Sequence, residues 1–180
     1  AGQVARGINA VPGASACLRT VPSVATGIGN RVPEVPAAGA PYVSSSDLQR
    51  CDGLVLGSPT RFGNMAAALK YFIDGTASEW LAGTLRGKPA GVFTASSSLH
   101  GGQESTLLAL YHTFYHWGSI IVPPGYTDPA FYAAGGNPYG VSATADPQQP
   151  EVAEATLEAV RVMTRRLVQV AGWLLKGQAA

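Results

Sequence analysis

Two short loops of this sequence have the residue types and positions expected of a ligand-binding site. Residues 60–64 closely follow the apolar run Leu54–Leu56, and residues 96–102 closely follow the apolar segment Pro89–Thr94. Short apolar runs bounded by glycine or proline predict buried strands of a parallel sheet. Ligands of open α/β sheets bind outside the carboxyl ends of the strands, so both loops are predicted to meet at one binding edge.

The first loop is part of a predicted strand-to-helix turn that extends from Gly57 to Met65. Glycine and proline shape its backbone, and Asn64 is predicted to cap the helix that follows. The apolar residues of that helix recur at helical spacing up to Gly75, where the helix is predicted to stop. Backbone amides of such a loop, together with the positive end of the helix dipole, favour an anionic or electron-rich ligand.

Several other site chemistries lack their motifs. Residues 83–88 are similar to a phosphate-binding loop, but the segment is one residue short and Pro89 replaces the required hydroxyl residue. There is no Gly-x-Ser-x-Gly nucleophile turn, no zinc-type spacing of histidines and cysteines, and no Gly-x-Gly-x-x-Gly dinucleotide fingerprint. Any bound NAD(P)H is therefore expected to occupy the ligand site transiently and not a pocket of its own.

Composition predicts one compact α/β domain over residues 1–180. Apolar residues make up 46% of the 180 residues and charged residues 13%, which fits a well-buried core. The net charge is +1 and Lys and Arg are scattered, so no basic patch for nucleic acid is expected. No apolar run approaches the length of a membrane span. Cys17 and Cys51 lack metal or redox spacing and are predicted to be buried thiols of a reducing compartment.

The elements that position the two loops follow from periodicity. Helices are predicted at Ala1–Ile8, at Gln103–Trp117 and in the C-terminal stretch from Val160 to Leu174, each with apolar residues three or four apart. Alternation of strands and helices predicts right-handed crossovers and a parallel sheet. Further predictions are strands at Ala14–Val21 and Ser119–Val122, a surface loop at Pro22–Tyr42, a short helix capped within Ser44–Asp47, and a turn at Gly135–Gly140 in a long insertion.

Several motifs occur in an order that resembles the WrbA family of flavodoxin-like NAD(P)H:quinone oxidoreductases. They are Ser58–Met65, Trp80, His100–Glu104, His116, Pro124–Tyr126 and Gly136–Gly140. The resemblance covers the chain from about Asp47 onward. It implies a flavodoxin-like three-layer sandwich with a central parallel sheet, bound FMN, NAD(P)H as co-substrate and quinones as electron acceptors.

The resemblance also implies roles for individual residues. Two histidines, His100 and His112, are expected to be bystanders. Trp80 and His116 are implied to contact a planar substrate, and His116 could assist protonation of the quinol. Both have alternatives, since Trp80 could be a packing residue and His116 a positively charged cap at a helix end. The implied cofactor-binding residues are Pro59, Thr60, Arg61, Phe62, Gly63, Asn64, Ser96, Ser97, Ser98, Gly101 and Gly102.

The resemblance implies a cytoplasmic protein. The family assembles as tetramers, which implies a homotetramer in which residues 77–85 help to build the pocket of a neighbouring subunit. In a flavodoxin-like sheet the first strand is central and is followed by the phosphate-binding loop. The sequence begins in what reads as the following helix. We therefore expect the natural polypeptide to carry about 20 further N-terminal residues, comprising an apolar strand, a Ser/Gly-rich loop and the start of that helix.

Two rival functions remain. One is a one-electron carrier of the flavodoxin type, although such carriers are usually acidic and this sequence has a net charge of +1 and a Trp-bearing insertion. The other is a flavin-free structural or interaction protein of the same fold. The visible spectrum of the purified protein, with and without added FMN, separates them.

Overall fold

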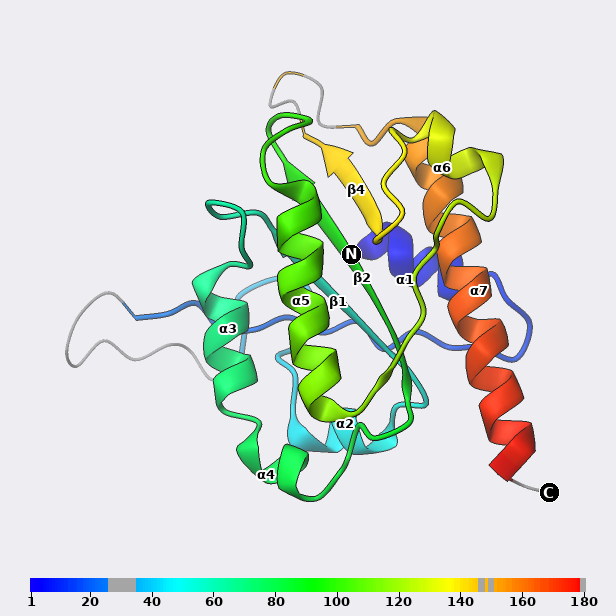
Figure 1. Cartoon of the computed structure of the whole chain (residues 1–180). Coiled ribbons are helices and arrows are strands. Elements are labelled where there is room, and N and C mark those ends of the chain that lie inside the picture. The colour runs from blue at the N-terminus through cyan, green and yellow to red at the C-terminus, as the bar shows by residue number, and fades with distance from the viewer. Residues whose placement is uncertain (26–34, 146–147, 149–150, 179–180) are drawn as a thin grey trace.

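The computed structural model describes residues 1–25, 35–145, 148 and 151–178, and its helices and strands alternate along most of the chain (Figure 1). In order, these elements are α1 (Gly2–Asn9), α2 (Ser45–Arg50), β1 (Leu54–Pro59), α3 (Ala67–Asp74), α4 (Ala77–Leu81), β2 (Pro89–Ser96), α5 (Gln103–Trp117), β3 (Ile120–Ile121), α6 (Pro129–Ala133), β4 (Val141–Thr144) and α7 (Glu154–Gln178).

The described strands form a parallel sheet with β2 at its centre. Leu54 of β1 pairs with Ala90, and the register continues to Pro59 opposite Ala95. On its other side, β2 pairs first with the two residues of β3 and then, further along, with β4. β3 and β4 therefore act as one strand interrupted by a long insertion. Among the described residues, β2 is the only strand that pairs with β1.

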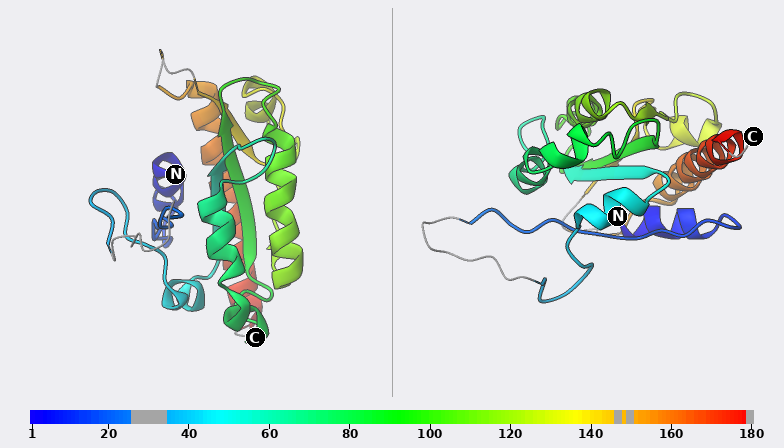
Figure 2. Two further views of the ribbon diagram at one scale, coloured as in Figure 1. Left: turned by 90° about the vertical axis from the view of Figure 1, so that its left-hand side faces the viewer. Right: turned by 90° about the horizontal axis from the view of Figure 1, so that it is seen from below.

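Apolar residues of the strands alternate between the two faces of the sheet, as the pleat requires. Leu56 and Val92 pack with α3 and α5 in one core. Val55 and Phe93 pack against residues of α1, α6 and α7 in another. Two views of the molecule show α5 on one side of the sheet and α1 with α7 on the other (Figure 2). The result is the predicted layered α/β arrangement, with helices on both faces.

Most predicted elements are confirmed. The helix predicted at Gln103–Trp117 has these same ends, and Gly118 follows it with a φ of 67°. The C-terminal helix is α7, and Val160, Met163 and Leu167 on its apolar side are buried. The short capped helix is α2, which begins after Ser44. The parts of the predicted 22–42 loop that lie at residues 22–25 and 35–41 contain neither helix nor strand, and residues 26–34 lie outside the described residues.

Two strand predictions are wrong or incomplete. The strand predicted at Ala14–Val21 is absent, and Thr20 forms only an isolated bridge with Tyr42. A strand needs a neighbour that completes its ladder. In the described part of the chain, the only backbone groups that bond to the backbone of this segment are those of Pro41 and Val43, apart from the turn contact of the Ala14 amide with the Val11 carbonyl. The strand predicted at Ser119–Val122 is reduced to the two residues of β3, and β4 after the insertion was not predicted.

The prediction of two buried thiols is also wrong, because Cys17 is exposed and Cys51 is half-buried. Cys17 lies on the extended segment that failed to form a strand, where no helix layer covers it. Cys51 lies at the end of α2, where its Sγ donates to the Leu48 carbonyl at 3.3 Å. Burial raises the pKa of the Cys51 thiol.

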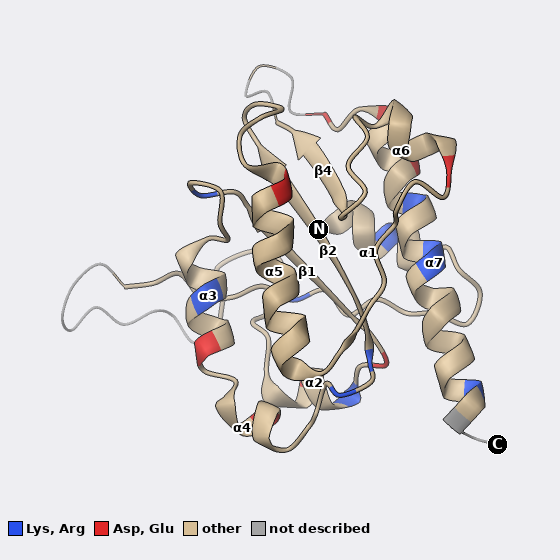
Figure 3. Cartoon of the chain, viewed as in Figure 1, with Lys and Arg blue, Asp and Glu red and all other residues tan. Residues whose placement is uncertain are grey.

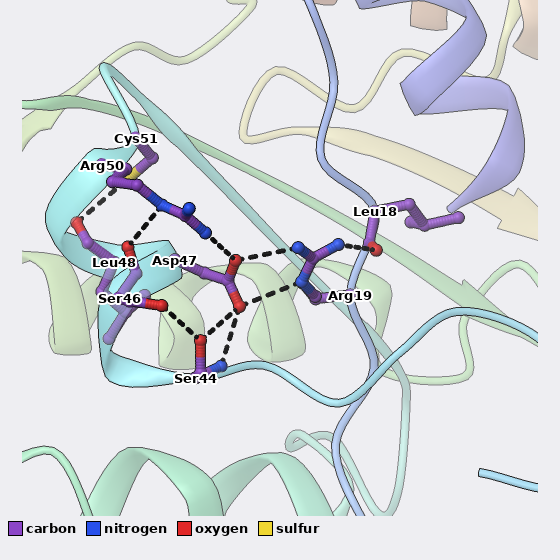
Figure 4. Close-up of polar contacts among 8 residues, drawn as sticks. All are labelled: Leu18, Arg19, Ser44, Ser46, Asp47, Leu48, Arg50 and Cys51. Atoms are coloured by element: carbon purple, nitrogen blue, oxygen red, sulfur yellow. Dashed lines mark hydrogen bonds and ion pairs between the residues drawn. The ribbon is translucent and has the colours of Figure 1, made fainter. Parts of the chain in front are cut away.

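An ion-pair cluster joins the N-terminal segment to α2 (Figure 4). The guanidinium of Arg19 donates to both carboxylate oxygens of Asp47, each at 2.9 Å. The backbone amide and hydroxyl of Ser44 donate to the same carboxylate at 2.9 and 2.7 Å, which completes a capping box for α2. Hydrogen bonds from Arg19 and then from Ser44 hold the pKa of Asp47 well below its usual range.

We expect Asp47→Asn to lower the free energy of unfolding at neutral pH, with a deficit that shrinks in acid. The folded-state pKa of Asp47 lies below its unfolded value of about 3.9, so its stabilising effect is present above that pH. The effect is lost as pH falls below about 4 towards the folded-state pKa. Urea unfolding of both proteins between pH 7 and pH 3 measures the difference.

Asp74→Asn is the matched control for this experiment. Asp74 is exposed and pairs with Lys70 one helical turn away, an arrangement that contributes little to stability. Parallel pH curves for wild type and Asp47→Asn would contradict the linkage that the cluster predicts.

Charged residues are distributed over α1, α3, α5, α7 and the connecting loops, and both signs occur together (Figure 3). This distribution agrees with the scattered Lys and Arg of the sequence. Among the described residues, no helix has both the length and the apolar character needed to cross a membrane.

Candidate functional site

The loop after β1 is a tight turn with an unusual backbone. The amide of Arg61 donates to the Asn64 carbonyl at 2.7 Å, and the amide of Asn64 donates back to the Arg61 carbonyl at 3.1 Å. The two residues at the corner, Phe62 and Gly63, have φ values of 52° and 75°. Two consecutive positive φ angles are typical of a type I′ turn. Glycine adopts this conformation without strain, but phenylalanine rarely does.

Phe62 is therefore held in a costly conformation with its ring fully exposed to solvent. Among the described residues that have a side chain, it alone has a positive φ. Backbone strain of this kind occurs most often at ligand-binding positions, where the surrounding structure maintains it. An exposed aromatic ring on a rigid turn provides an apolar surface for a planar ligand.

Asn64 does not cap the following helix as predicted. Its side-chain oxygen accepts from the amide of Met65 at 2.8 Å, inside the loop. α3 begins later, after Ala66, because the Ser58 hydroxyl accepts from the Ala66 amide at 2.8 Å and holds the chain extended up to that point. The side chains of Asn64 and Ser58 thus fix the backbone just after the turn.

The loop after β2 is shaped by serine and glycine. Ser96 is the last residue of the strand, and its hydroxyl donates to the Ser98 carbonyl at 2.5 Å. The amide of Gly101 donates to the same carbonyl at 3.0 Å. Gly102 has a φ of 87° and precedes the first turn of α5. A Cβ built on Gly101 would lie 3.0 Å from the Ser96 side chain, so a larger residue there would require the loop to shift.

The two loops meet as predicted. The Thr60 amide donates to the Ala95 carbonyl at 2.9 Å, which extends the β1–β2 ladder to the start of the first loop. A Cβ built on Gly102 would lie 2.7 Å from the Cα of Gly63, so the backbones touch where both residues are glycine. The candidate cofactor residues of the two loops therefore form one surface at the carboxyl edge of the sheet.

This surface fits a flavin. The amides of Phe62 and Gly63 have no hydrogen-bond acceptor within the described residues, so they are available to a ligand. Arg61 is exposed and its Nη1 donates to the Thr60 carbonyl at 2.8 Å. Free amide donors, an exposed aromatic ring and glycines that permit close backbone approach together suit the polar edge and the apolar faces of an isoalloxazine ring.

Trp80 and His116 lie towards the other end of the molecule from the 96–102 loop. Trp80 is on α4, and its indole Nε1 donates to the His116 carbonyl at 2.8 Å. α5 rises about 1.5 Å per residue, so His116 lies about 20 Å along the helix from Gln103. Figure 1 shows α4 at the foot of the chain and the 96–102 loop at its top. One chain by itself does not bring these two residues against that loop.

Trp80 and His116 instead line a groove between α3 and α5 with a volume of about 550 Å³. His112, expected to be a bystander, lines the same groove. The groove reaches Asn64 and Met65, so it is continuous with the end of the first loop. His100 is exposed on the second loop.

Two residues that sequence reasoning did not assign to the site hold it together. Gln103 and Thr106 are buried on α5. Gln103 donates to Ser96 at the start of the second loop, and Thr106 donates to Thr60 at the start of the first. The sequence does contain a sign of their role, because both polar residues lie on the helix face that carries Leu107 and Leu110. A polar residue on the apolar face of a helix needs a specific partner.

A parallel sheet between helix layers, with two candidate ligand-binding loops at its carboxyl edge, is typical of a flavodoxin-like protein. The crystal structure titled as a flavodoxin, WrbA-like protein from Agrobacterium tumefaciens has the same fold, with a TM-score of 0.58 at 24% identity over 73% of this chain and 75% of that one. Residues 41–131 match the family model described as NADPH-dependent FMN reductase.

Sequence relatives specify the family further. An NAD(P)H dehydrogenase (quinone) from Geobacter sulfurreducens is 40% identical over 95% of this chain and 89% of its own length. Another from Aromatoleum aromaticum is 34% identical over 98% of this chain and 90% of its own length. The chain belongs to this family, the WrbA-like NAD(P)H dehydrogenases (quinone).

Proposed function

We propose that this protein reduces quinones with two electrons from NAD(P)H, using FMN held at the carboxyl edge of the sheet. The observation that carries the proposal is the contact between the 60–64 and 96–102 loops, which places free amides and an exposed ring at one edge. The family relatives named for this activity support it.

The residues of the two loops would hold FMN mainly through backbone contacts. The Phe62–Gly63 corner would offer its free amides and its ring to the isoalloxazine system, and residues 96–102 would border the pyrimidine end. When bound, FMN supplies the two-electron chemistry that takes a hydride from NAD(P)H and passes it to a quinone. The nicotinamide and the quinone would occupy the same exposed site in turn.

We further propose that the protein is a cytoplasmic homotetramer in which one chain contributes Trp80 and His116 to the site of another. The support is the distance of both residues from the 96–102 loop and the exposure of Trp80, which is 53%. Trp80 would stack on the planar quinone, and an imidazole nitrogen of His116 would supply a proton to the reduced oxygen. Sedimentation analysis measures the assembly, and a monomer that is fully active would contradict this arrangement.

The visible spectrum of the purified protein, followed by oxidation of NADH with and without benzoquinone, tests the function. We expect yellow protein, or protein that turns yellow with added FMN, and NADH oxidation that depends on the quinone. FMN binding without quinone reduction would favour the one-electron carrier. Protein that stays colourless with excess FMN would favour the flavin-free interaction protein.

We expect Trp80→Ala to raise the KM for the quinone several-fold while the affinity for FMN changes little. A stacked aromatic pair contributes about 0.5–1.5 kcal/mol beyond its buried area, which corresponds to about 2- to 13-fold in binding. Steady-state kinetics and FMN titration measure the two effects. Trp173→Ala is the matched control, because Trp173 is similarly exposed (61%) but lies near the end of α7. Equal KM values for the two variants would show that Trp80 does not contact the quinone and would favour the alternative, a packing role.

A further inference from the structure

The first turn of α5 carries two polar side chains that are completely enclosed. Gln103 is 3% exposed and Thr106 is 0% exposed. They lie one turn apart, on the side of the helix that packs against the sheet with Leu107 and Leu110. Burying an amide and a hydroxyl is unfavourable unless each finds a partner. Their partners therefore show what the two side chains do.

Gln103 joins the second loop to the last strand. Its side-chain nitrogen donates to the Ser96 hydroxyl at 2.8 Å. The same nitrogen lies 3.3 Å from the Thr144 hydroxyl and 3.4 Å from the Ala143 carbonyl, at the end of β4. Ser96 in turn donates to the Ser98 carbonyl at 2.5 Å. A short hydrogen-bond chain thus leads from α5 through Ser96 into the turn of the 96–102 loop.

Thr106 joins the first loop to the same helix. Its hydroxyl donates to the Thr60 hydroxyl at 2.8 Å and lies 3.5 Å from the Asn64 carbonyl. Thr60 can then donate to the Gly102 carbonyl, 3.5 Å away. Thr106 therefore contacts both ends of the 60–64 turn, and through Thr60 it reaches the residue at which the second loop ends.

We propose that Gln103 and Thr106 are positioning residues, which hold the 60–64 and 96–102 loops in the shape that binds FMN. They act through Ser96 and Thr60, from a helix turn that is fixed in the core. Because Gly63 and Gly102 touch, a small shift of either loop displaces the other. The effect on FMN binding rests on the proposed function, whereas the effect on the shape of the loops rests on the hydrogen bonds alone.

Hydrogen exchange of the FMN-free protein tests the geometry without the cofactor. We expect Thr106→Val to speed exchange at the amides of Arg61 and Asn64, which bond to each other across the turn. Gln103→Glu keeps the side-chain length but replaces the donor nitrogen by an acceptor, so it should speed exchange chiefly at Gly101, whose amide bonds to Ser98. Unchanged exchange at all three amides in both variants would overturn the proposal.

FMN titration by fluorescence tests the consequence. We expect Thr106→Val to raise the Kd for FMN about fivefold, the effect of one lost hydrogen bond on the loop that binds it. Thr106→Ser keeps the hydroxyl and should restore most of the affinity. Thr164→Val is the matched control, because Thr164 is equally buried but its hydroxyl bonds inside α7 to the Val160 carbonyl at 2.8 Å.

The controls separate positioning from general stability. If Thr164→Val and Thr106→Val raise the Kd equally, or Thr106→Ser fails to restore affinity, the positioning role is wrong. If Thr106→Val does not fold, Thr60→Val removes the same bond from its less buried end. In the FMN-free protein it must speed exchange at the same two amides, those of Arg61 and Asn64. If wild type binds no FMN but the exchange pattern is as expected, the proposed function is wrong, while the positioning of the two loops by Gln103 and Thr106 is supported.

Discussion

Gly63→Val should weaken FMN binding by about 5- to 30-fold, because a residue with a side chain pays about 1–2 kcal/mol to adopt a left-handed conformation. Gly63 has a φ of 75°, and a Cβ there would lie 2.9 Å from the Ser105 hydroxyl. The branched side chain would also obstruct the close approach of backbone and ligand. FMN titration by fluorescence measures the loss.

Two comparisons show whether shape or charge is responsible. Arg61→Lys keeps the positive charge and should change the Kd for FMN much less than Gly63→Val does. Gly13→Val imposes the same backbone strain, since Gly13 has a φ of 80°, but nothing lies within 4 Å of its Cβ and it is outside the two loops. It should cost stability without changing the Kd. A silent Gly63→Val would remove the 60–64 loop from the cofactor site.

Gly140→Ala should lower the melting temperature by about 5–10 °C, which corresponds to about 2–3 kcal/mol for a chain of this size. A Cβ on Gly140 would lie 2.5 Å from the carbonyl oxygen of Val92 and 3.2 Å from the side chain of Leu107. Both neighbours are fully buried, and the nearest atom is backbone of the central strand, so neither can move aside. The start of β4 must shift instead.

Gly172→Ala is the control for this substitution. Gly172 lies within α7 and has no atom within 4 Å of its Cβ, so alanine should leave stability unchanged or raise it by up to about 1 kcal/mol. Thermal unfolding followed by circular dichroism compares the two variants. A Gly140→Ala protein as stable as wild type would mean that β4 is not held against β2 as tightly as its register indicates.

The candidate site was predictable in its parts because local sequence signals specify it. The strand before each loop is a short apolar run, and glycines mark the positions where the backbone turns. Parallel strands place such loops at the same edge whatever their distance in sequence, so their meeting followed from the fold class. The turn geometry at Phe62 was not predictable, since no propensity favours phenylalanine at a positive φ.

The position of Trp80 and His116 illustrates a different limit. The order of the motifs identifies Trp80 and His116 in the sequence, but it does not predict where they lie in the folded chain. The direction and length of α5 carry His116 away from the 96–102 loop, and the indole of Trp80 follows it through a hydrogen bond to its carbonyl. This distance is why we propose that both residues serve the site of a neighbouring chain.

By itself, the sequence determined the longer helices and the central strands, because periodicity and the positions of glycines are local signals that act within one element. The five-residue helices α4 and α6 were not predicted. Tertiary structure alone decided which extended segments became strands. Val141–Thr144 forms β4 because β2 offers a free ladder beyond β3. Among the described residues, Ala14–Val21 finds no such ladder, because the only backbone that bonds to its own is that of Pro41 and Val43, apart from a turn contact with Val11. Strand formation depends on the neighbour that satisfies the backbone, and that neighbour is chosen by the fold.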